Sequence, residues 1–314
     1  MKTELTKEYY DDEYSKFAKV MGENGDWKTA EQLEIKMIEM RKKVLGDEHP
    51  DTLASMGYLA NTYWKQGRWS KAEQLQVQLI EIGKKVLGDE HPDTLLIMEN
   101  LASTYCKQGR WSEAEELQIQ VMDMRKKMLG EEHLNTLSSL GNLASIYCKQ
   151  GRWNEAEQLQ IQVMKMRKKV LGDEHPDTLL SMGNLASTYS KQGKWNEAEQ
   201  LQIQLMKTRK KMLGEEHLDT LSSVGNLASI YSKQGRWNEA EQLQIQVMEM
   251  RKKVLGDEHP HTLSSMGNLA STYSDQKRRN EAEQLEIQVM EIRKKLLGPE
   301  HPKTLRSMGT LART

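Results

Sequence analysis

Seven histidines recur along the chain, and one or two acidic residues stand just before each of them: His49, His91, His133, His175, His217, His259 and His301. Imidazole and carboxylate groups are common zinc ligands. Neighbouring members of the series are 42 residues apart, however, whereas the ligands of one ion must all lie about 2.1 Å from it. We therefore interpret these histidines as loop structure and predict no metal site.

Two other residue types could do chemistry. Tryptophans recur at the same spacing and could stack on nucleic acid bases, although an aromatic residue that opens a repeated helix is more typical of packed core: Trp27, Trp69, Trp111, Trp153, Trp195 and Trp237. Serines are abundant but recur in every repeat, whereas a catalytic serine needs one asymmetric setting. No phosphate-binding loop, G-x-G-x-x-G, C-x-x-C or H-E-x-x-H pattern occurs. We predict neither an enzyme nor a cofactor.

The constant 42-residue step determines the fold that must position these side chains. A period of this length indicates a solenoid, in which each unit buries its apolar face only against its neighbours. The period runs through almost the whole chain, so we predict one domain over residues 1–314. Its parts are a degenerate first unit at about 11–52, regular units at about 53–276, and a degenerate last unit with a truncated final helix at about 277–314.

The sequence of a single repeat predicts two helices. Residues 177–192 carry apolar side chains at helical spacing, and Gly193 is a left-handed stop. Trp195 opens a second apolar run that ends at Gly214. The segment LQIQVM at 159–164 alternates like a strand, but residues 153–171 contain no Gly or Pro, and strands rarely exceed about ten residues. We predict a continuous helix there and an all-α protein.

Composition narrows the possible partners. The chain holds 45 basic and 46 acidic residues, so no whole-molecule field favours nucleic acid or an anionic membrane. No apolar stretch approaches 18 residues and the first residues are polar and acidic, so we expect a cytoplasmic protein that does not insert into membranes. Cys106 and Cys148 are one repeat apart, roughly 10 Å in a helical solenoid, which is too far for a disulfide. We expect free thiols.

The residues Leu185, Ala186, Tyr189, Gly193, Trp195 and Ala198 match the signature of the tetratricopeptide repeat (TPR), which this chain therefore resembles. The 42-residue length and the R-K-K-V-L-G-D-E-H-P segment are similar to the kinesin light chain subclass. The H-P-D-T-L segment is similar to C-terminal arrays of fungal NLR-like signalling ATPases. The resemblance implies a right-handed superhelical α-solenoid of antiparallel helix pairs, acting as a protein-binding scaffold. In one respect the chain departs from the pattern: Gln160, Gln202 and Gln244 replace an aromatic residue of the second helix.

In such repeats the first helix of each pair lines a concave face that holds an extended peptide. The resemblance then implies a groove formed by Asn100, Asn142, Asn184, Asn226 and Asn268, by Ser103, Ser145, Ser187, Ser229 and Ser271, and by Trp64, Lys65, Lys107, Lys149, Lys191 and Lys233. A row of side-chain amides can both donate to and accept from a peptide backbone. The asparagines could instead join one repeat to the next without a ligand. Four helix-interior glycines suggest that a neighbouring helix or a ligand approaches closely there: Gly141, Gly183, Gly225 and Gly267.

Other interpretations remain open. A basic row that includes Arg167, Lys168 and Lys169 is expected on the convex side, where it is solvated. Single-stranded nucleic acid could follow the groove lysines, although balanced charge argues against it. The array could also self-assemble end to end through Leu305 and the apolar residues near it, weakly and head to tail, or be an engineered array with no ligand. Near the far end, Lys277 replaces the turn glycine.

Overall fold

The computed structural model describes residues 16–17, 20–22 and 24–311. The chain forms two compact units, Met1–Leu159 and Gln160–Thr314, which are treated separately below. The single domain expected over residues 1–314 remains a prediction. The degenerate first helix expected at residues 11–24 lies mostly outside the described residues.

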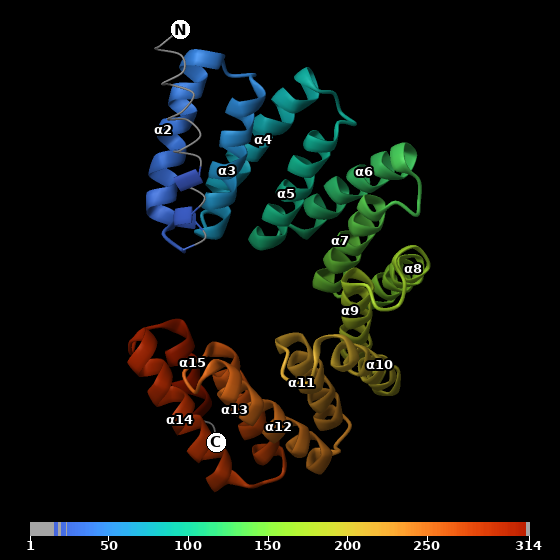
Figure 1. The fold of residues 1–314 in the computed structure, drawn as a ribbon, viewed down its shortest axis with the longest axis vertical. Helices are drawn as coiled ribbons and strands as arrows, with labels where there is room; N and C mark the ends of the chain where they lie inside the picture. Colours follow the sequence, from blue (N-terminus) through green and yellow to red (C-terminus); the bar gives the residue numbers. More distant parts are fainter. Residues whose placement is uncertain (1–15, 18–19, 23, 312–314) are drawn as a thin grey trace. The chain divides into compact units, whose positions relative to one another are not determined.

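Every regular element of the described residues is an α-helix, which confirms the all-α prediction (Figure 1). Two kinds alternate. The first helices of the repeats begin at Pro or Leu, and the second helices begin at Trp or Arg: α2 Trp27–Leu45, α3 Pro50–Lys65, α4 Trp69–Val86, α5 Pro92–Gln108, α6 Trp111–Leu129, α7 Leu134–Gln150, α8 Trp153–Leu171, α9 Pro176–Gln192, α10 Trp195–Leu213, α11 Leu218–Lys233, α12 Trp237–Leu255, α13 Pro260–Asp275, α14 Arg279–Leu297 and α15 Pro302–Leu311.

The alternating LQIQVM segments lie inside the second helices. In α8 the segment from Leu159 to Met164 is helical throughout, so the prediction of a continuous helix is confirmed. None of the helices in the described part of the chain is long and apolar enough to cross a membrane.

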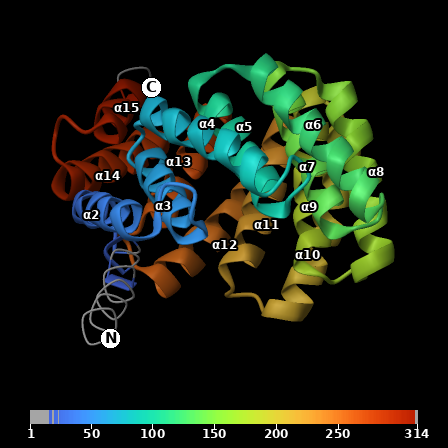
Figure 2. The same ribbon diagram turned by 90° about the horizontal axis from the view of Figure 1, so that it is seen from above.

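Within each unit, every helix packs against the next one in sequence. In unit 2 this holds from α9 to α15, and in unit 1 from α2 to α7 (Figures 1 and 2). The contacts bury leucine, methionine and alanine in small local clusters, such as Leu179 and Met182 of α9 with Leu205 of α10. No single large core exists in either unit's described residues, because each helix meets only its sequence neighbours.

The histidines explain where the first helices begin. His175 is the N-cap of α9, and its Nδ1 accepts a hydrogen bond at 3.1 Å from the backbone N–H of Asp177. Pro176 follows at the first helical position, where a missing N–H costs nothing. The other six histidines of the series cap their helices in the same way. They are loop structure, as predicted, and each satisfies a backbone N–H that a helix start leaves without a partner.

The turn between the two helices of a repeat uses a left-handed residue. Gly193 has φ 77° and closes α9 with its own N–H, a backbone conformation that glycine adopts at no steric cost. The equivalent residue in the turn after α13 is Lys277, whose φ is 64°. It is the only non-glycine residue with positive φ among those described.

Glutamine replaces the expected aromatic residue in the second helix for a structural reason. Gln202 of α10 is 1% exposed, and its Nε2 donates to the backbone oxygen of Ser223 on α11 at 3.0 Å. In unit 1, Gln118 of α6 binds Ser139 of α7 in the same way at 3.2 Å. At these two positions, the side chain joins a second helix to the first helix of the next repeat by a hydrogen bond, where an aromatic ring would join them by packing alone.

Candidate functional site

In each unit, the predicted asparagines and serines form an exposed polar row on the first helices. The side chains of all ten are exposed: Asn100, Ser103, Asn142, Ser145, Asn184, Ser187, Asn226, Ser229, Asn268 and Ser271. On each helix the two positions are three residues apart and therefore on one face. The leucine that follows each asparagine is buried and lies about 100° around the helix. Except for Asn142, the asparagine side chains make no hydrogen bond to any residue that the structure describes. Asn142 Nδ2 lies 3.5 Å from Glu99 Oε1.

In unit 2 this row borders an open hollow of about 250 Å³. Asn226, Ser229 and Lys233 of α11 line one side, and Ser187 and Lys191 of α9 line the other. We call it the unit 2 hollow. It brings together five of the residues predicted for the groove, and it carries two lysines and no carboxylate, so it favours an electron-rich ligand.

The floor of the unit 2 hollow was not predicted as a site. It is formed by Gly183 of α9 and by Trp195 and Gln202 of α10. The prediction that the repeated tryptophans are packed core is wrong in part: Trp69 and Trp237 are 37% and 41% exposed, and Trp195 is only partly buried. Of these tryptophans, Trp195 borders the unit 2 hollow together with Asn226 of the polar row.

Unit 1 contains a related hollow of about 200 Å³. Trp64 and Lys65 of α3 and Asn100 and Ser103 of α5 line it, and all four belong to the predicted groove. Lys65 and Lys107 place their ammonium groups 5.5 and 5.1 Å from the centre of the Trp64 ring, within the range of cation–π attraction. We call it the unit 1 hollow.

The remaining predicted groove residues border neither hollow. They lie on the same kind of helix face in their own repeats: Asn142, Asn184, Asn268, Ser145, Ser271, Lys107 and Lys149. The two cysteines of unit 1, Cys106 and Cys148, are partly buried and form no disulfide, as predicted.

No neighbouring helix packs closely against the helix-interior glycines. A Cβ atom at Gly141, Gly225 or Gly267 would meet nothing within 4 Å, and at Gly183 it would meet only a Leu205 methyl group at 3.5 Å. Of the two alternatives expected at these glycines, the close neighbouring helix is therefore wrong, and the ligand stays a prediction. They leave open space on the face that carries the polar row.

The prediction of a solvated basic row on the convex side is also wrong for the arginines of that row. Arg167 is 8% exposed, and its Nη1 donates to the hydroxyl of Ser181 at 2.9 Å and to the backbone oxygen of Asp177 at 3.2 Å. Lys168, its neighbour in sequence, does lie at the surface and pairs with Asp173 at 2.9 Å. The arginines of this series therefore lie between a second helix and the next first helix, and the lysines after them face solvent.

One of these arginines has a carboxylate partner from the polar face. In unit 1, Arg125 of α6 donates from Nη1 and Nη2 to the two oxygens of Glu99 on α5 at 2.7 and 2.8 Å. Glu99 occupies the position at which later repeats have glycine. Ser139 of α7 donates to the same carboxylate at 3.1 Å. The two paired side chains are only 10% and 14% exposed.

A second ion-pair system joins successive repeats. Arg236, in the turn before α12, donates from Nη1 to both oxygens of Glu199 on α10 at 2.9 Å, and its guanidinium lies 3.9 Å from the centre of the Tyr231 ring. Burial would raise the pKa of Glu199, but hydrogen bonds from Gln234 and Arg236 outweigh it and lower that pKa. The same arrangement recurs at other turns, and it holds the helices that present the polar row.

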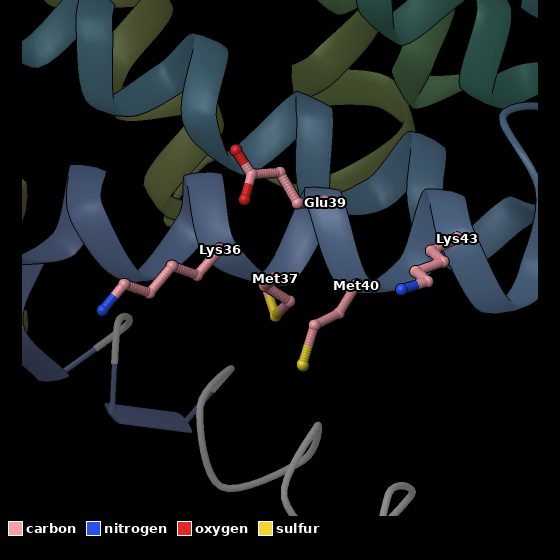
Figure 3. Close-up of a pocket in the computed structure, with 5 residues that line it drawn as sticks. All are labelled: Lys36, Met37, Glu39, Met40 and Lys43. Carbon is pink, nitrogen blue, oxygen red and sulfur yellow. The ribbon is translucent and has the colours of Figure 1, made fainter.

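A third hollow, of about 330 Å³, lies on the side of α2. Figure 3 shows the side chains that line it, and all five come from that one helix: Lys36, Met37, Glu39, Met40 and Lys43. Groups from a single helix cannot converge on a ligand from several sides. It is therefore a weaker candidate than the other two hollows.

Comparison with known proteins supports the fold. The tetratricopeptide repeat family model matches residues 14–85, 58–127, 93–159, 134–211 and 217–295. Comparison with curated protein sequences finds no match. A Podosopora anserina structure with nearly identical, kinesin-light-chain-type TPR-like repeats is 37% identical, with a TM-score of 0.59, over 66% of this chain and 99% of that one.

Two more distant structures share the fold alone. A signal transduction ATPase with a TPR sensor from Pyrococcus horikoshii has a TM-score of 0.65 at 14% identity and covers 87% of this chain, which spans 41% of that protein. The quorum sensor NprR, solved with its cognate peptide NprX, has a TM-score of 0.56 at 16% identity over 96% of this chain and 87% of that one. The repeat motif, the helix pairs and the family match agree: the chain belongs to the tetratricopeptide repeat family.

Proposed function

We propose that this protein is a non-catalytic scaffold that binds an extended peptide segment of a partner protein along the polar face of its first helices. The observation that carries the proposal is the exposed asparagine row, because four of its five side chains make no hydrogen bond to any described residue. An amide that can both donate and accept matches a peptide group. Neighbouring repeats are roughly 10 Å apart, and a peptide in the polyproline II conformation advances about 3.1 Å per residue with three residues per turn, so one asparagine would meet every third residue.

The hollows add side-chain pockets to this row. In the unit 2 hollow, Lys191 and Lys233 favour acidic or carbonyl-rich segments, and Trp195 offers an apolar surface. Among the related folds, NprR is known in complex with a peptide, which supports a peptide as the kind of ligand. Backbone recognition would supply affinity, and the hollows would supply selectivity.

The test is a selection of random twelve-residue display peptides on the immobilised chain, followed by fluorescence anisotropy with the selected peptides. Replacing the three asparagines of unit 2, Asn184, Asn226 and Asn268, together with alanine should weaken binding at least 100-fold while helicity is retained, since three backbone contacts at about 1 kcal/mol each are lost.

A matched control carries the same change in exposed asparagines that open the second helices: Asn196, Asn238 and Asn280. Its affinity should stay within threefold of the parent chain. The groove hypothesis fails if the two triple variants bind equally well.

Single-stranded nucleic acid is the second candidate, and one observation now favours it more than the sequence did. Trp195 and Trp64 both border hollows that contain lysines, and base stacking on aromatic rings beside cations is the usual mode of single-strand binding. The formal charge of −1 argues against it, because phosphate binding needs several uncompensated cations. We expect no better than weak binding in a gel shift at physiological salt, and submicromolar binding to RNA would reverse the ranking.

A further inference from the structure

Glu99 lies where one repeat contacts the next, a place that we call a junction, and its contacts show that a junction can bind a carboxylate. Its carboxylate starts from the polar face of α5 and reaches inward to Arg125 of α6, where Ser139 of α7 also donates to it. Asn142, a member of the asparagine row, lies 3.5 Å from the same carboxylate. The arginine, serine and asparagine thus form a carboxylate site, and in this repeat the chain fills it with its own side chain. We call it the closed junction.

The equivalent junction in unit 2 has the same site without the acid. Gly225 stands where Glu99 stands in the closed junction, and a Cβ there would meet nothing within 4 Å. Arg251 of α12 is 8% exposed, and its Nη1 donates to Ser265 of α13 at 2.8 Å. Asn268 of α13 is exposed at the rim. We call this the open junction.

The guanidinium of the open junction lacks a counter-charge. Among the described residues, no carboxylate lies within ion-pair distance of Arg251, whose other contacts are the hydroxyl of Ser222 and the backbone oxygen of His261, both at 3.3 Å. Its Nε is buried without a hydrogen-bond acceptor. Burial without a compensating charge lowers the pKa of this guanidinium. A buried cation in this state has much to gain from an anion.

We propose that the open junction binds a carboxylate of the partner peptide, which enters over Gly225 and pairs with Arg251 as Glu99 pairs with Arg125. The inference rests on the proposed function, since it assumes that a peptide lies along the polar face, and it adds the chemistry of that peptide. A planar carboxylate fits because a guanidinium can bind it with two parallel hydrogen bonds.

A second open junction lies one repeat earlier. Arg209 of α10 donates to Ser223 of α11 at 2.9 Å, Gly183 takes the place of the acid, and Asn226 stands at the rim. Gly183 and Asn226 both line the unit 2 hollow, so this junction opens into it. Neighbouring repeats are roughly 10 Å apart, and a peptide in the polyproline II conformation advances about 3.1 Å per residue with three residues per turn. Side chains three positions apart then point to the same side, so the preferred peptide carries acidic residues three positions apart.

The experiment follows arginine Nε–H signals of the full chain by NMR during titration with acetyl-Gly-Glu-Gly-amide. The signal of Arg251 should shift and saturate in the millimolar range, as expected for one ion pair with little other contact. The Gln peptide at equal ionic strength should leave that signal unchanged. Gly-Gly-Gly with a free C-terminus distinguishes a terminal carboxylate from a side-chain carboxylate. The proposal is overturned if the Glu and Gln peptides shift the signal equally.

Two exchanges between the junctions complete the test. Gly225→Glu should fill the site from within and abolish the response of Arg251, whereas Gly225→Ala should keep it. Glu99→Gly should open the closed junction and create a new response at Arg125. If Gly225→Glu folds with unchanged helicity and Arg251 still responds as in the parent chain, the inference is wrong. The Glu99→Gly exchange tests it equally if the first variant does not fold.

The tripeptide result is independent of the display selection. If selected peptides bind through the asparagines but Arg251 does not respond to Glu, the inference fails and the proposed function stands. If Arg251 responds but the asparagine variant loses no affinity, the carboxylate site exists and the proposed backbone recognition fails. If both hold, selected peptides should be enriched at least fivefold in acidic residues three positions apart, and this enrichment should fall in selections on Gly225→Glu.

Discussion

The closed and open junctions are made from the same repeat and differ chiefly by one acidic side chain. In the closed junction, Glu99 neutralises Arg125 with two hydrogen bonds of 2.7 and 2.8 Å. In the open junction, Gly225 leaves Arg251 with hydroxyl and carbonyl contacts only. A repeat array can therefore keep a buried arginine at the same position in several repeats. The residue at the position of Glu99 or Gly225 then determines whether the carboxylate that pairs with this arginine comes from the chain itself or from a ligand.

The largest expected effect is on the closed junction itself. Glu99→Gln leaves Arg125 buried without its counter-charge and should lower the free energy of unfolding by about 3 kcal/mol, the lower end for a broken buried pair. Urea unfolding followed by circular dichroism measures it. Glu90→Gln, which removes an exposed partner of Lys127, should cost less than about 0.5 kcal/mol. Equal costs would mean that Arg125 needs its carboxylate no more than Arg251 does.

A contrasting acid lies in unit 1, where Glu34 of α2 replaces the glutamine of most other repeats. Burial raises its pKa to about 7, against the lowering effect of a hydrogen bond from Thr62. No cation of the described residues pairs with it. A folded-state pKa above the unfolded value means that this group's contribution to stability is complete below about pH 4.5 and is lost as pH rises through 7.

Glu34→Gln should therefore stabilise the protein by about 1–2 kcal/mol at pH 8 and have little effect at pH 5. The full shift would correspond to about 3 kcal/mol, and a smaller effect is expected because the structure around a buried charge relaxes and lowers its cost. Thermal or urea unfolding at the two pH values measures the difference. A variant that gains nothing at pH 8 would show that Glu34 is charged at little cost.

A smaller effect is expected for the ion pairs that join successive repeats. Glu199→Gln should destabilise unit 2 by about 1 kcal/mol at pH 7, because Arg236 keeps its pairing with Glu239. Hydrogen bonds from Gln234 and Arg236 lower the pKa of Glu199 below its ordinary value, so the advantage of the parent chain should persist at pH 5 and be lost in more acidic solution, as pH falls through the lowered pKa of the folded state. Glu249→Gln, on an exposed face of α12, is the control and should be neutral.

The smallest expected effect concerns self-association. Leu305 of α15 is 53% exposed, and an unpaired helix face of one molecule can pack on another molecule in a head-to-tail manner. We predict weak association at millimolar concentration, measured by sedimentation, which Leu305→Lys should reduce. A closed dimer with a fixed two-fold arrangement would contradict it.

The helices, their caps and the polar row could be predicted from the sequence, because each depends on the spacing of residues within one repeat, and this spacing is the same in most repeats. The junctions could not be predicted in the same way. Arg125 stands in the run Arg-Lys-Lys, which is typical of a solvated helix end, and only its position four residues after the buried Val121 places it on the inner face. Glu99 in place of a glycine was a visible departure, but its partner lies on another helix, and pairing across helices requires the packed structure.

The prediction that the tryptophans are packed core was wrong in part for a related reason. Their regular spacing indicates a common structural role, and a large apolar ring favours burial. Whether a ring at a helix start is covered depends on the path of the turn before it, and Gly193 and its equivalents hold that turn close to the surface. Side-chain type alone therefore overestimated the burial of Trp69 and Trp237.

The turn after α13 is also the place where we expect a protease to cleave the folded protein first. Lys277 holds a left-handed backbone conformation at φ 64°, which costs a non-glycine residue roughly 1 kcal/mol, and its side chain is exposed. Local opening is therefore easiest at this turn, and trypsin cuts after lysine. Limited digestion should cleave first within the run Lys277-Arg278-Arg279 and release α14 and α15 from the remaining helices. Lys277→Gly leaves both arginines as cutting sites, so a slower cleavage of this variant would report the removed strain.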